Sequence, residues 1–174
     1  MIFPLFRRSQ GPATISALYG MIVAQARSPV FYREYGVSDT VDGRFELLLL
    51  HLFLVLRRLG TGSEREVGQQ VFDLFCQDMD RNLREMGIGD LKVPAEMRRI
   101  GEAYYGRSKA YEAALASGDE GALSAVIARN VFGAPEHEPP GVAALGTYIK
   151  RALDELARQD AADLQRGHVS FPQP

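Results

Sequence analysis

Apolar residues recur every three or four positions along most of the chain, a spacing typical of helices that bury one face. No stretch alternates apolar and polar residues as a half-buried strand does. The pattern therefore predicts an all-α fold, a single-domain bundle of six or seven helices. We expect this domain to span residues 14–165, with flexible segments at 1–13 and 166–174. The predicted helices lie at about 14–27, 29–36, 41–59, 67–86, 94–115, 120–132 and 141–156.

The helix predicted at about 41–59 is the most apolar part of the chain. Between Arg44 and Arg57 lie twelve residues, of which only Glu46 and His51 are polar. Such a stretch rises about 18 Å, too short to cross about 30 Å of hydrocarbon. A helix that is apolar almost all round is usually buried by neighbours on several sides. We therefore expect it to be the central core helix, with the alternative that part of its surface is open to a partner.

The helix predicted at about 67–86 has a well-marked end. Gly87 suits the left-handed position that follows a helix, and Ile88 then packs against Leu83. A second helix should begin near Pro94, because proline fits the first turn of a helix. The short connection favours antiparallel packing of the two helices. The predicted buried stripe of the first helix consists of Val71, Leu74, Phe75, Met79, Leu83 and Met86.

Charged residues gather around this corner. Asp80 and Arg84 carry opposite charges four positions apart, and so do Arg81 and Glu85. Residues at this spacing are neighbours on a helix surface, so both pairs should form. Asp90 lies just beyond the helix end, and we expect it to cluster with Asp80 and Arg84.

Arg107 and Tyr111 lie on the second helix. If the two helices pack antiparallel, Arg107 meets Asp73 or Asp80 in a partly buried pair. That pair is either a salt bridge that fixes the helix register or a polar rim beside an apolar binding surface. We expect charge reversal at Arg84 or Arg107 to lower the function of the protein without unfolding it.

Composition excludes several classes of protein. The 174 residues are 46% apolar and 24% charged, which argues against disorder, and a net charge of −2 provides no basic surface for nucleic acid. One cysteine permits no intramolecular disulfide, and the N-terminus does not match a secretory signal. The expected location is the cytoplasm. Residues 1–8 combine apolar side chains with two arginines, and form either a frayed end or a peripheral tether to the inner face of the plasma membrane.

No pattern of reactive residues predicts an enzyme or a cofactor. The three histidines are far apart, and the chain has no HxxxH or CxxC spacing for a metal and no glycine-rich phosphate loop after a strand. Nothing marks a serine or cysteine nucleophile beside a histidine base. For haem, His51 is the only candidate ligand, and a lone histidine on an apolar helix is more often a hydrogen-bonded core residue. We therefore predict a non-catalytic protein without a cofactor.

Two segments carry a resemblance to a known family. They read DTVDGRFELLLLHLFLVLRRL (39–59) and VFDLFCQDMDRNLREMGIGDLKVPAEMRRIGEAYYGRSKAYEAAL (71–115), with a looser match in FYREYG (31–36). The chain resembles the ubiquinol–cytochrome c chaperones, assembly factors of respiratory complex III, over about residues 29–131. The most specific part is the run DMDRNLREMGIGD. The mitochondrial members of the family carry an N-terminal targeting region. This chain lacks one, and in that respect it resembles a bacterial member.

The resemblance implies a non-catalytic chaperone that binds cytochrome b or another complex III subunit and that works with a small partner protein. A chaperone for a membrane protein needs an apolar surface with a polar rim. The alternatives are an α-helical adaptor for another membrane complex and a carrier of a small apolar ligand or haem. The candidate partner-binding residues are Arg44, Phe45, Asp80, Arg84, Asp90, Tyr104, Arg107 and Tyr111.

Overall fold

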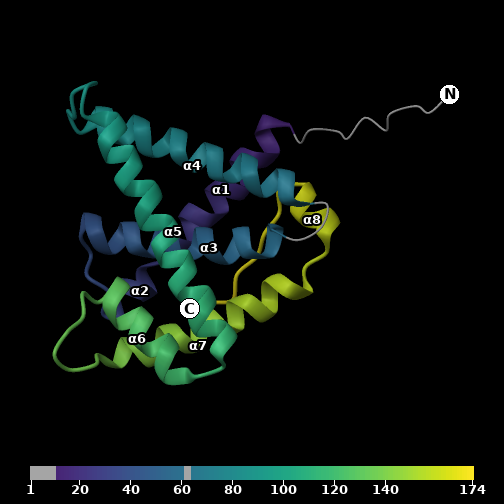
Figure 1. Cartoon of the computed structure of the whole chain (residues 1–174). Coiled ribbons are helices and arrows are strands. Elements are labelled where there is room, and N and C mark those ends of the chain that lie inside the picture. The colour runs from purple at the N-terminus through teal and green to yellow at the C-terminus, as the bar shows by residue number, and fades with distance from the viewer. Residues whose placement is uncertain (1–10, 61–63) are drawn as a thin grey trace.

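The structure is a computed structural model that describes residues 11–60 and 64–174. Within these ranges the chain forms eight helices and no strand (Figure 1). Only α2 and α8 are as short as five residues, so six long helices confirm the predicted all-α bundle. In chain order the helices are α1 (Pro12–Ala26), α2 (Pro29–Arg33), α3 (Val41–Leu59), α4 (Arg65–Glu85), α5 (Val93–Ser117), α6 (Glu120–Val131), α7 (Pro140–Arg158) and α8 (Ala161–Gln165).

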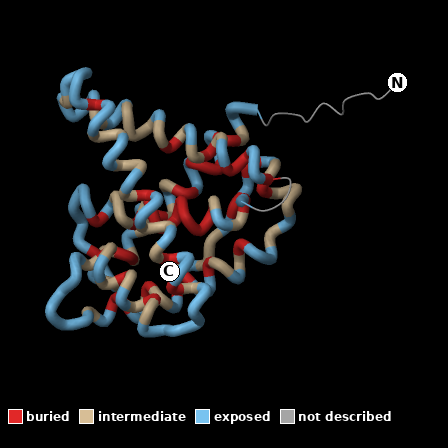
Figure 2. The backbone as a smooth tube through the Cα atoms, in the orientation of Figure 1, coloured by how far each residue is buried: buried red, intermediate tan, exposed pale blue. Residues whose placement is uncertain are grey.

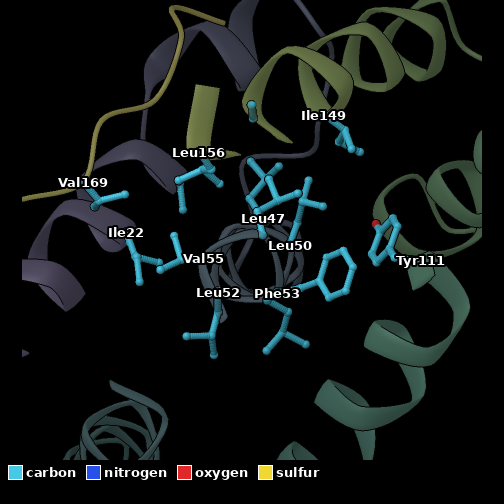
Figure 3. Packing of buried hydrophobic residues seen from close by; sticks show 14 of the residues in the cluster. Ile22, Leu47, Leu50, Leu52, Phe53, Val55, Tyr111, Ile149, Leu156 and Val169 are labelled. Carbon is cyan, nitrogen blue, oxygen red and sulfur yellow. The ribbon is translucent and has the colours of Figure 1, made fainter. Parts of the chain in front are cut away.

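Helix α3 is the centre of the bundle. It contacts α1, α4, α5, α6 and α7, and its apolar side chains belong to the same hydrophobic core as theirs. Figure 3 shows Leu47, Leu50, Leu52, Phe53 and Val55 of α3 pointing in different directions into the core, where all five are buried. The predicted central helix is therefore confirmed. Among the described residues, no helix combines the length and the apolarity needed to cross a bilayer.

The N-terminal boundary of the domain differs slightly from the prediction. Helix α1 begins at Pro12 rather than at residue 14, because proline is favourable in the first turn of a helix. Residues 1–10 lie outside the described residues, and with them most of the predicted flexible segment and the whole of the predicted membrane tether at 1–8.

The end of α4 and the start of α5 form a corner that projects from the body of the molecule (Figure 1, upper left). Gly87 has a φ of +84°, and the Ile88 N–H donates to the Leu83 carbonyl oxygen at 3.0 Å. This is the predicted helix end. The two helices run back from the corner in opposite senses, and Phe72 on α4 meets Tyr104 on α5 with their ring centroids 5.0 Å apart. Figure 2 shows that the corner is mostly exposed, whereas buried residues concentrate around α3.

The C-terminal segment 166–174 contradicts the prediction of a flexible tail. Val169 is buried, and Phe171 packs against the hydrophobic core. The Gln25 side-chain amide on α1 donates to the Pro172 carbonyl oxygen at 3.2 Å, and the Ser170 N–H donates to the Gln159 side-chain oxygen at 2.9 Å. These contacts join residues that are eleven or more positions apart in sequence, so the spacing of apolar residues along a helix does not predict them.

Candidate functional site

A groove of about 690 Å³ opens beside the α4–α5 corner. Its walls come from the last turns of α1, the first half of α3, the second half of α4 and the first half of α5. We call this feature the corner groove. It is lined by Val23, Ala26, Arg27, Val41, Asp42, Arg44, Phe45, Leu48, Asp78, Met79, Asn82, Leu83, Glu85, Met86, Glu96, Arg99, Ile100 and Ala103.

The corner groove is apolar inside, and its apolar surface is open to solvent. Ten of its eighteen lining residues are apolar. Val41 at the start of α3 is 72% exposed and Met86 at the end of α4 is 67% exposed, although both are large apolar residues. Exposed apolar side chains gathered around a concave surface mark an interaction site rather than a stable bare surface.

Charged residues form a rim around this apolar interior. On the α3 side, the Arg44 side chain donates to Asp39 at 2.6 Å. On the α5 side, Arg99 donates to Glu96 at 2.7 Å. Asp78 on α4 accepts a hydrogen bond from the Tyr19 hydroxyl at 2.9 Å, which links α4 to α1. The groove thus combines an apolar interior with a polar rim, as a protein-binding surface does.

Part of this surface follows from the predicted candidates, and part does not. Of those candidates, Arg44 and Phe45 line the groove. The α1 residues that close one side were not predicted, because the pattern of α1 reports only the face that packs on α3 and α4. The stripe predicted along α4 is buried only at Val71 and Phe75, while its end at Met86 lines the groove instead. No local signal separates a core stripe from a groove wall.

Asp80, Arg84 and Asp90 lie together at the α4–α5 corner, as predicted. The Arg84 Nε donates to Asp80 at 2.7 Å, and its Nη1 donates to Asp90 across the corner. The hydrogen bond from Arg84 holds the pKa of the Asp80 carboxyl below its usual value. The neighbours of Arg84 in sequence, Leu83 and Glu85, line the groove. These contacts therefore attach the end of α4, which forms one wall of the groove, to Asp90 on the other side of the corner.

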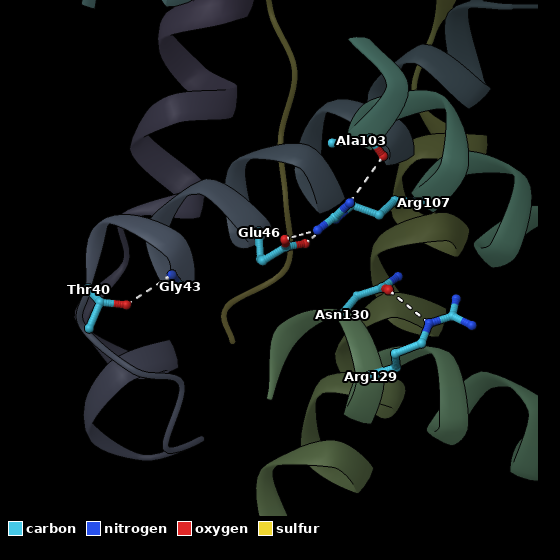
Figure 4. A network of polar contacts seen from close by, with 7 residues as sticks. All are labelled: Thr40, Gly43, Glu46, Ala103, Arg107, Arg129 and Asn130. Atoms are coloured by element: carbon cyan, nitrogen blue, oxygen red, sulfur yellow. Dashed lines mark hydrogen bonds and ion pairs between the residues drawn. The ribbon is translucent and has the colours of Figure 1, made fainter. Parts of the chain in front are cut away.

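The predicted partners of Arg107 are wrong. Arg107 does not meet Asp73 or Asp80; its Nε donates to Glu46 on α3 at 2.5 Å, and its Nη2 donates to the other oxygen of the same carboxylate (Figure 4). This hydrogen-bonded carboxylate raises the pKa of the Arg107 guanidinium. The physical reason is that α5 packs on α3 as well as on α4. The Arg107–Glu46 pair thus joins two of the helices that line the groove.

Tyr104 and Tyr111 are core residues rather than surface residues. Tyr104 packs against Phe72 and Phe75 of α4, and burial raises the pKa of its hydroxyl. Tyr111 is 2% exposed and stacks on Phe53 of α3 with ring centroids 5.5 Å apart. The candidate binding surface does not include them.

His51, the candidate haem ligand, is fully buried with both ring nitrogens engaged. Its Nδ1 lies 2.7 Å from the Leu47 carbonyl oxygen and its Nε2 lies 2.9 Å from the Tyr148 hydroxyl. A carbonyl can only accept, so Nδ1 carries the proton and Nε2 accepts from Tyr148. The Tyr148 oxygen in turn accepts from the Gln25 side-chain amide at 3.0 Å. Along residues 11–60 and 64–174, no three histidine, cysteine or acidic side chains gather in a way that would hold a metal ion.

This neutral state of His51 predicts a pH-dependent stability. Burial lowers the pKa of His51 to about 4 from 6.5. Between these two values the unfolded chain binds the proton and the folded chain does not, so the free energy of unfolding falls as the pH falls. The expected loss between pH 7 and pH 5 is about 2 kcal/mol, measured by urea unfolding at both values.

The matched variants are His51→Gln, which should lose most of this pH dependence, and His137→Gln in the exposed loop before α7, which should keep it. An NMR titration of the wild-type ring provides the same information without a variant. A ring that titrates above pH 6 in the folded protein would contradict the prediction.

The same arrangement of helices occurs in a known family. A family model described as Ubiquinol-cytochrome C chaperone matches residues 33–171, which extends beyond the resemblance at 29–131 and includes α7 and α8. The crystal structure of the Cbp3 homolog from Brucella abortus is similar, with a TM-score of 0.86 and 38% sequence identity over 99% of this chain and 97% of that chain. No match to this chain occurs among the curated proteins. The chain belongs to the ubiquinol–cytochrome c chaperone family.

Proposed function

We propose that this protein is a non-catalytic assembly chaperone of ubiquinol–cytochrome c reductase. In this role the corner groove holds an apolar segment of cytochrome b, or of an early assembly intermediate that contains it. The observation that carries the proposal is that two exposed large apolar side chains, Val41 and Met86, lie together at one apolar groove, as they do at an interaction surface. Family membership supports the link to complex III.

The chemistry of the groove supports this assignment. A subunit of a membrane complex exposes apolar surface until its own partners cover it, and such surface aggregates in water. An apolar groove covers that surface reversibly, because its residues replace water without forming bonds that must later be broken. A helix that lays its apolar face into a groove is a common mode of such recognition.

The proposed role places the protein beside the inner face of the membrane, where a cytochrome b segment is accessible. Residues 1–8 carry Ile2, Phe3, Leu5 and Phe6 next to Arg7 and Arg8, and this composition suits a peripheral contact with anionic lipid. A small partner protein would act on another face, since the groove is proposed for the client.

Charge placed in the groove tests the assignment. We expect Met86→Glu to reduce the cytochrome b that copurifies with the protein about tenfold and to lower the level of assembled complex III. The physical reason is that a carboxylate must lose its water when an apolar client covers it. Met86 is 67% exposed but lies at the C-terminal end of α4, where a carboxylate is disfavoured, so the free energy of unfolding should fall by no more than about 1 kcal/mol.

The matched control is Leu91→Glu. Leu91 lies at the same corner and is 98% exposed, but it is not among the residues that line the groove. The variant should behave as wild type. Equal loss in both variants, or normal assembly with Met86→Glu, would remove the groove from the proposal. Unchanged complex III in a deletion strain would favour an adaptor for another membrane complex.

A further inference from the structure

Two carboxylates at the corner groove have no partner among the residues that the structure describes. Asp42 on α3 and Glu85 on α4 both line the groove and are exposed. Neither forms an ion pair or a side-chain hydrogen bond within the described ranges. For Glu85 this differs from the prediction, because Arg81 pairs with Asp78 at 3.3 Å instead. Both acids are therefore available to a ligand.

The position of Glu85 costs the isolated protein stability. It is the last residue of α4, and the carbonyl groups at the C-terminal end of a helix give that end a partial negative charge. A carboxylate there is disfavoured, whereas Asp42, in the first turn of α3, is favoured by the opposite end of a helix dipole. The stability of α4 therefore does not explain why an acid stands at this position. A cation bound in the groove would explain it.

The other charges of the groove leave this acidic character in place. Two of its three arginines are already paired, Arg44 with Asp39 and Arg99 with Glu96. Arg27 is the remaining base, so the unpaired groups on the described lining are two acids and one base. The charge that a ligand meets beside the apolar interior is therefore net negative.

We propose that the corner groove selects an apolar helical segment that is flanked by lysine or arginine, with its flanking cations placed at Asp42 and at Glu85, one at each acid. This inference rests on the proposed function, and it specifies which feature of the client the groove recognises. Segments that cross a bilayer carry an excess of lysine and arginine next to their cytoplasmic ends. A groove with an apolar interior and an acidic edge thus distinguishes the cytoplasmic end of such a segment from the opposite end.

Synthetic peptides test this selection with the full-length protein. Three labelled amphipathic helices of about eighteen residues share one apolar face and differ only in two flanking residues, which are lysine, glutamine or glutamate. Fluorescence anisotropy should show that the lysine peptide binds at least about threefold more tightly than the glutamine peptide, and that the glutamate peptide binds most weakly. High salt should reduce these differences, since the acids are exposed.

Variants assign the preference to the two acids. The double variant Asp42→Asn, Glu85→Gln should bind all three peptides with the affinity of wild type for the glutamine peptide. The matched control is Asp154→Asn on α7, because Asp154 is exposed, lies outside the groove and also lacks an ion pair in the described part of the chain.

Each outcome has a defined meaning. Equal affinity of wild type for the lysine and glutamate peptides, or an equal effect of Asp154→Asn, would overturn the charge selection. If the glutamine peptide still binds and Met86→Glu weakens it, the proposed groove survives that result. If no peptide binds and Met86→Glu leaves complex III unchanged, the proposed function fails together with the inference.

Discussion

Arg107→Glu should destabilise the fold by about 3 kcal/mol, because it breaks a largely buried ion pair between α3 and α5. Glu46 has a side chain that is 11% exposed, and that of Arg107 is 30% exposed. The substitution leaves two carboxylates facing each other where water cannot solvate them fully. Urea unfolding followed by circular dichroism measures the loss.

Two variants make this expectation specific. Arg57→Glu breaks the ion pair between Arg57 and Glu112, in which the two side chains are 43% and 52% exposed. It should lower the free energy of unfolding by no more than about 1 kcal/mol. The double variant Glu46→Leu, Arg107→Leu removes both charges and should recover most of the lost stability. A loss of less than about 1 kcal/mol in Arg107→Glu would show that the pair contributes little.

This result would also correct an expectation from sequence. Charge reversal at Arg107 was expected to leave the fold intact, but the buried partner on α3 makes unfolding the first effect. Arg84 differs, since its partners Asp80 and Asp90 lie at the exposed corner. For Arg84 a loss of function without unfolding stays a prediction.

Deletion of residues 169–174 should also cost about 3 kcal/mol or more. It removes Val169, which is buried, and Phe171, whose ring packs edge to face against the His51 ring with the ring centroids 5.5 Å apart. Burial of one such apolar side chain contributes about 1.5–3 kcal/mol. The deletion also exposes the buried His51 to water. Thermal and urea unfolding of the shortened chain measure the loss.

The control is a shorter deletion. Removing only Gln173 and Pro174 takes away an exposed hydrogen bond, from Arg151 to the Gln173 carbonyl oxygen at 2.9 Å, and should change stability by less than about 1 kcal/mol. Equal stability of the longer deletion and the wild type would mean that the C-terminal segment contributes nothing to the core, as its sequence had suggested.

The local parts of the fold could be predicted because they depend on neighbouring residues alone. The period of α3 and its near-complete apolarity sufficed to name it as the central helix. Gly87 and Ile88 were enough to locate the end of α4, since the left-handed turn and its hydrogen bond to Leu83 involve only adjacent turns. For the same reason the Asp80–Arg84 pair formed as expected.

One contact within α4 could not be predicted, because Arg81 had a suitable partner four residues later and another three residues earlier. The choice of Asp78 left Glu85 open to the groove.

The contacts between distant segments could not be predicted either. The C-terminal segment has no helical period, so its burial depends entirely on the surface that α1, α3 and α7 offer it.

The sequence by itself determined the six long helices to within a few residues, the turn that ends α4, the central place of α3 and the family resemblance. Only the tertiary structure decided that Arg107 meets Glu46, that Tyr104 and Tyr111 are buried, and that Val41 and Met86 flank one groove. The physical reason is that a helix repeats every 3.6 residues whatever lies beside it, whereas the crossing of two helices depends on how side chains from distant segments fit together. The groove exists only because the crossings of the four helices that line it leave it open.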